Sequence, residues 1–257
     1  MTNVYRAVQY RLCLLDNRPP APDEVYNAVL EADEMLLQMS RDFPEWLTAG
    51  SATRSPDMSC AALSSAKCAF HIAYLHIRLK IHGSFCCLGL TDKRYYYSSA
   101  TCLDSAKTIL SNYRDAAAHA SPQMWTVAPH VISAGIVLTM HLLFSSAHLD
   151  SGFSRLTSAT SSPTLPQDRQ LMIDCVEMVA ALERPSEIIK RGMTMIYRLL
   201  EEGQSRTTQY HSLDSRESRR LLKEVENFLS GQELFPTIGQ GVSSTGLRGD
   251  DEVPNLF

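Results

Sequence analysis

Apolar residues recur at spacings of three and four along most of the chain, and runs of alternating apolar and polar residues are nearly absent. Spacings of three and four place side chains on one face of an α-helix, whereas alternation is typical of strands. The sequence therefore predicts an all-α fold, a bundle of roughly eight helices. The expected helices cover about residues 4–15, 23–39, 59–81, 98–113, 122–147, 168–182, 185–202 and 214–229.

Local signals predict where several helices begin and end. Asp23 is expected to cap the second helix, because a short polar side chain can accept a hydrogen bond from the free backbone N–H groups of the first turn. Pro185 is expected to open the seventh helix, and Gly203 to lie just past its end. The apolar segment Phe43–Leu47 follows the second helix and is expected to pack against the core.

Two of the expected helices are rich in apolar residues. The helix over 59–81 has apolar residues on nearly every face and is therefore expected to be a central element surrounded by partners. Thr126–Phe144 is the longest apolar stretch, but it contains Pro129 and two histidines and lacks a flanking basic cluster. These features favour a buried core helix over a membrane span, and we expect no contact with a membrane.

The polar segments divide the chain into one domain and a tail. Residues 149–167 are rich in Ser and Thr and contain two prolines, which predicts either a long exposed loop or a disordered insertion between helices. From residue 232 onward the chain is rich in Gly and then acidic, which is typical of a flexible tail. We therefore expect a single helical domain over 1–231 and a tail over 232–257. The glycines of 239–246 superficially resemble a phosphate-binding loop, but neither a preceding strand nor a following helix is expected there.

Composition narrows the class of protein. The chain has 257 residues, of which 44% are hydrophobic and 20% charged, so it can bury a sizeable core and is not a disordered or collagen-like protein. Its net charge of -4 lacks the excess of cations that binding to nucleic acid requires. The chain is therefore not expected to bind DNA by itself. Its first residues do not resemble a secretion signal.

The basic residues near the C-terminal end give only a weak charge signal. Arg216, Arg219, Arg220 and Lys223 alternate with three glutamates on one predicted helix. Such alternation is typical of a solvated face held by pairs three or four residues apart, with contact to phosphate groups or a nuclear import signal as the alternative.

The seven cysteines are odd in number and follow no recurring spacing, which favours free thiols in a reducing compartment. A zinc site could start from Cys68 and His71, three residues apart, with ligands added from His82, Cys86 or Cys87. The chain has no paired Cys-x-x-Cys motif, so packing residues are favoured over metal ligands at these positions. We expect neither a metal nor a cofactor in this domain.

Three side chains on apolar helices suggest a place for a small molecule. His71, Tyr74 and His141 could line a pocket between helices, with ordinary buried side chains that satisfy one another as the alternative. His141 also shares a helix face with His148, two turns later. The sequence contains no nucleophile elbow and no metallohydrolase motif, so an enzyme is not expected. An enzyme acting on a small metabolite in this pocket is kept as the alternative function.

Several stretches, taken in order, resemble a known family. The helix beginning at Tyr97 and Ser98, with Cys102, Leu103 and Ala106 following, is similar to a motif of the fungal-specific transcription factor domain, the middle homology region of zinc-cluster transcription factors. The segment ending in His82 resembles the family's Leu-His-Arg-Pro-Phe motif, although Gly83 and Ser84 replace its Arg-Pro pair. The resemblance covers about residues 4–200 and corresponds to the C-terminal portion of the family's region.

The resemblance implies an all-helical regulatory domain in the nucleus. Such a domain would act through protein contacts, with the transcription machinery or with itself, or through a small effector. The motif residues Tyr97, Ser98, Cys102, Leu103, Ala106 and His82 are expected to be structural. The family's zinc-cluster DNA-binding module needs six clustered cysteines, which this sequence does not have. Zinc and direct DNA contact are therefore expected only of that missing module. A structural assembly subunit is a further alternative.

Overall fold

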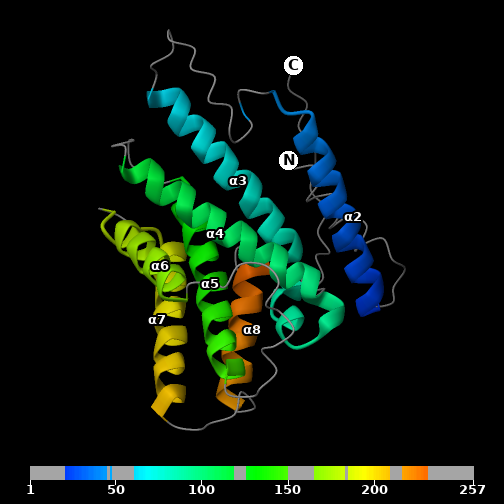
Figure 1. Cartoon of the computed structure of the whole chain (residues 1–257), viewed down its shortest axis with the longest axis vertical. Coiled ribbons are helices and arrows are strands. Elements are labelled where there is room, and N and C mark those ends of the chain that lie inside the picture. Colours follow the sequence, from blue (N-terminus) through cyan, green and yellow to red (C-terminus); the bar gives the residue numbers. More distant parts are fainter. Residues whose placement is uncertain are drawn as a thin grey trace, which may run out of the picture.

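The computed structural model describes residues 21–44, 47, 61–118, 126–149, 165–182, 185–208 and 216–230. Within these ranges the chain forms α-helices and two short 3-10 helices, and no strand (Figure 1). The α-helices are α2 (Pro22–Arg41), α3 (Ala61–Cys86), α4 (Tyr96–Ala118), α5 (Ala128–Leu149), α6 (Leu165–Ala180), α7 (Glu187–Thr208) and α8 (Arg216–Ser230). The 3-10 helices η2 (Leu88–Leu90) and η3 (Lys93–Tyr95) form the corner between α3 and α4. The expected all-α fold is confirmed.

Seven of the eight expected helices are present near their predicted positions. The expected first helix, over 4–15, lies outside the described residues, as do most of the expected loop over 149–167 and the expected tail over 232–257.

The predicted start of α2 was wrong by two residues. The helix begins at Pro22, and Ala21 takes the capping position in place of Asp23. Proline suits the first helical position because its fixed φ is helical and its missing N–H is not needed there. The Glu24 side chain accepts a hydrogen bond from the backbone N–H of Ala21 at 3.0 Å. The side chain that caps the start of α2 is therefore Glu24, in the first turn of the helix, and not Asp23.

The predicted end of α7 was also wrong, because the helix continues through Gly203 to Thr208. A methyl group at Gly203 would lie 3.1 Å from Cδ1 of Leu143 on α5. The glycine therefore serves close packing between two helices and does not end one of them. At the other end of α7, the Ser186 hydroxyl accepts from the N–H of Ile189 at 3.4 Å.

Two more boundaries differ from expectation. Helix α6 already begins at Leu165, with Pro166 in its first turn, where proline is tolerated. Helix α3 continues five residues beyond the expected Ile81, because Phe85 and Cys86 are also apolar and are buried, at 5% and 4% exposure.

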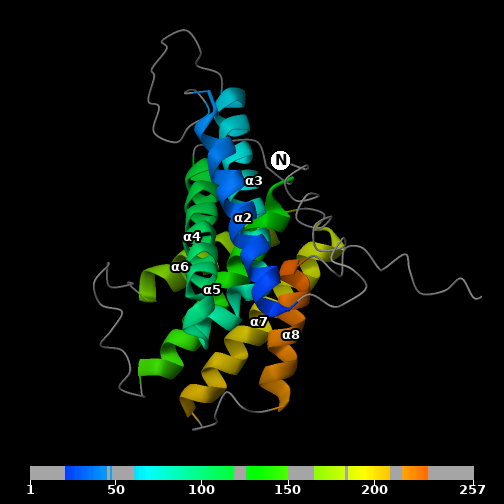
Figure 2. The same cartoon turned by 90° about the vertical axis from the view of Figure 1, so that its right-hand side faces the viewer.

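Helix α5 lies at the centre of the bundle, between α4, α6 and α7 (Figures 1 and 2). Every residue from 131 to 140 is buried. This confirms the expected core helix. No helix in the described part of the chain has the length and apolar character that crossing a membrane requires.

Glycines allow α5 and α7 to approach closely. An added Cβ at Gly192 would lie 2.1 Å from Cγ2 of Ile132, so the isoleucine methyl occupies the space beside the α7 backbone.

A glycine also lies where α3 meets α8. Gly83 of α3 faces Leu229 of α8, with 3.4 Å between an added Cβ and the leucine Cβ. The α3 backbone therefore packs closely against α8 at this position.

Helix α2 lies at the edge of the bundle beside α3, and the two run in opposite directions (Figure 1). Tyr26 near the start of α2 contacts Phe85 near the end of α3, with ring centroids 4.9 Å apart. Phe43, just after α2, contacts Phe70 near the start of α3, at 5.2 Å. The middle of this contact holds the charged cluster described next.

Candidate functional site: a buried charged cluster between three helices

A carboxylate is buried where α2 meets α3 and α4. Asp33 is 2% exposed, and the other buried residues of α2 are Val29, Ala32 and Leu36. Spacings of three and four between these positions place Asp33 on the apolar face of its helix. Burying a carboxylate is costly unless it is paired and hydrogen-bonded.

Two side chains from different helices hold this carboxylate. Arg78 of α3 donates through Nε to Oδ1 at 2.7 Å and through Nη2 to Oδ2 at 3.0 Å, a bidentate pair. Tyr97 of α4 donates its hydroxyl hydrogen to Oδ2 of Asp33 at 2.7 Å. Nη2 of Arg78 also lies 3.3 Å from the Tyr97 hydroxyl. Asp33 thus ties three helices together.

The environment favours the ionised form of Asp33. Burial by itself would raise the pKa of this carboxyl, but the adjacent His82 ring and the hydrogen bonds from Arg78 and Tyr97 outweigh burial and hold the pKa well below its usual range. Burial and the neighbouring carboxylate raise the pKa of the Tyr97 hydroxyl. The pKa of Arg78 is raised by its bonds to Asp33. The cluster is therefore an ion pair at neutral pH.

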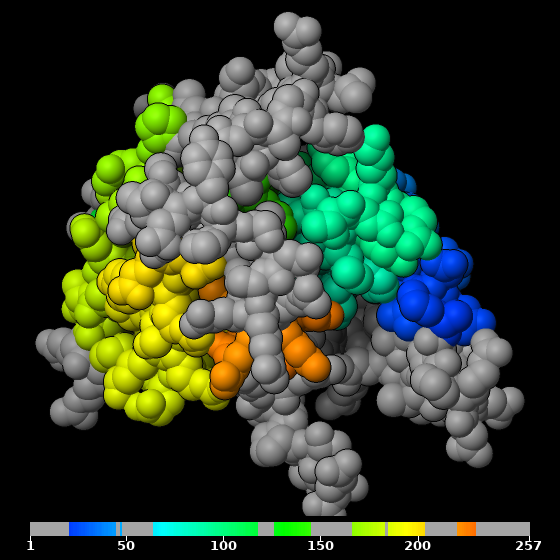
Figure 3. Space-filling view, turned by 90° about the horizontal axis from the view of Figure 1, so that it is seen from below, coloured from blue at the N-terminus to red at the C-terminus, as the bar shows by residue number. Residues whose placement is uncertain are grey.

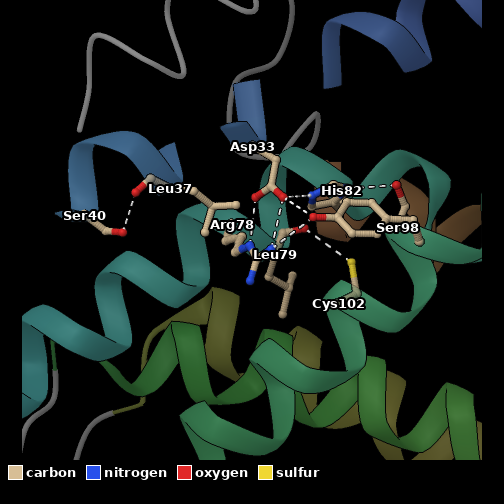
Figure 4. Close-up of polar contacts among 9 residues, drawn as sticks. Asp33, Leu37, Ser40, Arg78, Leu79, His82, Ser98 and Cys102 are labelled. Carbon is tan, nitrogen blue, oxygen red and sulfur yellow. Dashed lines mark hydrogen bonds and ion pairs between the residues drawn. The ribbon is translucent and has the colours of Figure 1, made fainter. Parts of the chain in front are cut away.

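His82 completes the cluster (Figure 4). Its ring is fully buried, and Nδ1 lies 2.8 Å from Oγ of Ser98. Its Nε2 lies 3.4 Å from Oδ2 of Asp33, an ion-pair distance without hydrogen-bond alignment, so this nitrogen has no hydrogen-bond partner among the described residues. The His82 and Tyr97 rings also meet edge to face, with centroids 5.5 Å apart.

The motif residues named from the sequence gather along the seam between α3 and α4. The Cys102 thiol lies 3.7 Å from the carbonyl oxygen of Leu79, one turn before His82 (Figure 4). Cys102 and Ala106 are fully buried, and Leu103 is partly buried against the core. Tyr97 is different, because its ring is 46% exposed while its hydroxyl reaches Asp33.

Sequence reasoning missed the two charged members of the cluster, Asp33 and Arg78. Their signal was present, because Asp33 is the only acidic residue on the apolar face of α2. A charge at an apolar position requires a partner of opposite charge. No pattern in the sequence pointed to Arg78 as that partner, since it is 45 residues away.

The three residues of the expected effector pocket have different neighbours. His71 accepts at Nδ1 from the amide of Asn112 at 2.9 Å. Tyr74 is buried and meets the ring of Phe43 at 5.8 Å. His141 lies on α5 near Lys107 and Asp168, which pair at 2.7 Å. A pocket shared by His71, Tyr74 and His141 stays a prediction.

A contact between two histidines joins α3 to α5. The rings of His76 and His130 are stacked with centroids 4.0 Å apart, and Nε2 of His76 lies 3.4 Å from Oγ of Ser133. Nδ1 of His130 is buried without a hydrogen-bond partner among the described residues. Burial, with a smaller contribution from Lys80, lowers the pKa of His130 to about 4. Burial and His130 lower the pKa of His76 well below its usual value.

Acid is therefore expected to weaken the fold through His130. Its pKa of about 4 lies below the unfolded value of about 6.5, so between these two pH values the unfolded chain binds more protons. The free energy of unfolding falls as pH falls through this window, by up to about 1.4 kcal/mol per pH unit for one histidine. His130→Phe keeps an aromatic ring and removes this titration. Urea unfolding from pH 7 to 4 should show a shallower pH dependence in the variant, and an equal slope would contradict this prediction.

The five described cysteines, Cys68, Cys86, Cys87, Cys102 and Cys175, are free thiols. Burial raises the pKa of Cys175 to about 12 and that of Cys68 above its usual value. Such thiols are poor nucleophiles because the reactive thiolate is scarce. The Cys68 thiol donates to the carbonyl of Asn112 at 3.5 Å, the same residue that holds His71. Within the described ranges, no three side chains of the His, Cys, Asp and Glu types gather closely enough to hold a metal ion.

The charged face of α8 forms ordinary pairs where it is described. Glu224 accepts from Arg198 of α7 at 2.7 Å and lies 3.4 Å from Nε of Arg220, one turn earlier. These two contacts agree with the expectation of paired charges on a solvated face. Arg216 and Arg219 have no described side chains.

The Asp33 cluster is suited to fixing α2, α3 and α4 relative to one another. Within it, Arg78 and Tyr97 both donate hydrogen bonds to the carboxylate of Asp33, and Nδ1 of His82 is hydrogen-bonded to Ser98.

Comparison with known proteins adds no further assignment, because no family model, no curated protein and no solved structure matches the chain.

Proposed function

We propose that this chain is a helical regulatory domain of the transcription-factor type, which acts through contacts with other proteins and does not itself bind DNA. The proposal rests on the resemblance of its α3 and α4 sequences to the fungal transcription factor domain. One observation supports it most. Residues of two separate motif stretches, His82 on α3 and Ser98 on α4, lie 2.8 Å apart in a buried contact. Motif residues that meet in space form one structural unit.

The charge of the chain supports action through protein. A net charge of -4 disfavours binding to the phosphate backbone, so the domain would need a partner or a fused module to reach DNA. Exposed aromatic side chains at the start of α4, Tyr96 at 58% and Tyr97 at 46%, offer the kind of side chain that protein interfaces favour.

The proposal is tested by tethering the chain to a promoter. The whole chain is fused to an unrelated DNA-binding module, and transcription of a reporter gene carrying that module's site is measured. We expect the fusion to raise or lower reporter transcription several-fold relative to the module alone. Unchanged transcription, with the fusion present in the nucleus at an equal level, would count against a regulatory domain.

A second measurement concerns DNA itself. Fluorescence anisotropy with the unfused chain and a pool of random duplexes at physiological salt should show no sequence-selective binding. Tight selective binding would contradict the proposal.

A further inference from the structure

Within the described residues, helix α2 packs mainly against α3. Its buried residues are Val29, Ala32, Asp33 and Leu36, and Val25, Tyr26 and Met39 are partly buried against the core. It lies at the edge of the bundle, and from below its surface is seen against that of the α3–α4 corner (Figure 3). A helix at the edge of the bundle with one main neighbour can separate locally at a cost below that of unfolding the core.

The surface of α3 and α4 beneath α2 has a charged group, Arg78, that requires a carboxylate on the helix packed against it. At one end Tyr26 meets Phe85 and Tyr95, both at 4.9 Å, and at the other end Phe43 meets Phe70. Between these aromatic contacts, Arg78 lies with its guanidinium directed at the carboxylate of Asp33.

We call this surface of α3 and α4 the α2 groove. An occupant must be an amphipathic helix with aromatic groups about five turns apart and a carboxylate between them. An occupant without the carboxylate would leave Arg78 unpaired. A second copy of this chain carries a helix that meets every one of these requirements, namely its own α2.

The connection between α2 and α3 is long enough to let α2 reach another copy. Phe43 contacts Phe70, which lies nine residues into α3 and therefore about 14 Å from its first residue. The seventeen residues from 44 to 60 can span roughly 55 Å when extended. The chain length thus does not force α2 into the groove of its own molecule.

We propose that two copies of this protein form a dimer by exchanging α2, each helix occupying the α2 groove of the other copy. The exchanged helix makes the same aromatic contacts and the same Asp33–Arg78 pair as in the single molecule. Exchange therefore gives up none of the contacts described above, and concentration decides between the two forms.

Charge reversal distinguishes exchange from every other mode of association. In the Asp33→Arg variant two arginines face each other, and in the Arg78→Asp variant two aspartates do. Each variant alone has a repulsive pair within the molecule. When the two variants are mixed, exchange of α2 creates two attractive pairs, one in each groove. No contact between unexchanged molecules can do this.

The experiment mixes equal amounts of the two variants, each with a different tag, and follows mass by light scattering after size exclusion. We expect a mixed dimer of twice 28.7 kDa, captured by either tag, and a higher melting temperature than for either variant alone. A double variant with both reversals on one chain restores the intramolecular pair, so its melting temperature should also recover. Recovery in the double variant without a mixed dimer would overturn the proposal.

A second measurement applies if the Asp33→Arg and Arg78→Asp variants do not fold. Two differently tagged wild-type copies are mixed at high concentration and captured by one tag. We expect co-capture that rises with concentration and that Asp33→Ala and Glu34→Ala change equally little, because the Asp33–Arg78 pair is present both before and after exchange. Glu34 is the neighbouring acidic residue on α2, and its side chain is 66% exposed. Absence of co-capture at high concentration, or a several-fold loss caused by Asp33→Ala and not by Glu34→Ala, would show that α2 exchange does not join the copies.

Discussion

Replacing Asp33 with alanine is expected to lower the free energy of unfolding by about 3 kcal/mol, the lower end of the range for removing one partner of a buried ion pair. Asp33 is 2% exposed, and its loss leaves Arg78 without the carboxylate that holds both of its nitrogens. The Arg78 side chain is 21% exposed and so keeps a path to water, which is why the lower end applies. For a chain of this size the melting temperature should fall by roughly 6–12 °C.

Urea unfolding followed by circular dichroism measures this effect, and Glu34→Ala is the matched control. Glu34 precedes Met35 on the exposed side of α2 and lies 3.9 Å from Arg41, with both side chains more than 60% exposed. Exposed pairs of this kind contribute little, so the control should change stability by less than about 0.5 kcal/mol. Equal stability of the Asp33→Ala and Glu34→Ala variants would show that the cluster does not hold α2.

The effect of Asp33→Ala is also expected to depend on pH. The pKa of Asp33 in the folded chain lies below its unfolded value, which is about 3.9. Stabilisation by a depressed carboxyl is fully present above the unfolded pKa and is lost as pH falls below it. The difference between wild type and variant should therefore stay constant from pH 7 to about 5 and shrink below about pH 4.

The fold could be predicted from sequence wherever helix periodicity decides the structure. Seven helices lie where the spacing of apolar residues placed them, and α5 is the buried core helix that its apolar sequence indicated. Boundaries were less predictable because local signals compete with packing. Gly203 is a typical helix terminator by itself, yet here it faces Leu143 inside a helix that continues.

The candidate site was predicted only in part, because its members are partners across long separations in the chain. His82 and Ser98 were named from motif resemblance, and the structure places them in contact. Arg78 and His76 lie on a helix that is apolar nearly all round, and such a helix has no face that the sequence alone assigns to one neighbour. The choice of partner helix depends on tertiary packing, which decided that Arg78 meets α2 and that His76 meets α5.

The contact between α5 and α7 makes a second large effect predictable. Ile132→Ala is expected to lower the free energy of unfolding by roughly 2–5 kcal/mol, because the isoleucine is fully buried and its removal leaves a cavity. Gly192→Ala should destabilise by about 1–3 kcal/mol, since its new methyl group would lie 2.1 Å from Cγ2 of Ile132 and 3.1 Å from Cζ of Phe228. The two changes affect the same small volume from opposite helices.

The double variant should therefore be more stable than the sum of the two single effects predicts. With Ile132→Ala in place, the methyl group of Gly192→Ala enters the space that Cγ2 has left and fills part of the cavity. A coupling energy of about 1–3 kcal/mol is expected, as for residues in direct contact. Urea unfolding of the wild type, both single variants and the double variant measures it.

Gly203→Ala on the same helix is the control for the glycine substitution itself. Among the described side chains, its methyl group would meet only Cδ1 of Leu143, the far end of a flexible side chain, at 3.1 Å. Alanine also favours helix over glycine by about 1 kcal/mol, so this change should be near neutral. Additive effects of Ile132→Ala and Gly192→Ala, within about 0.5 kcal/mol, would mean that the two side chains do not compete for one space. Coupling here, with none between Ile132→Ala and Gly203→Ala, assigns the close approach of α5 and α7 to Gly192.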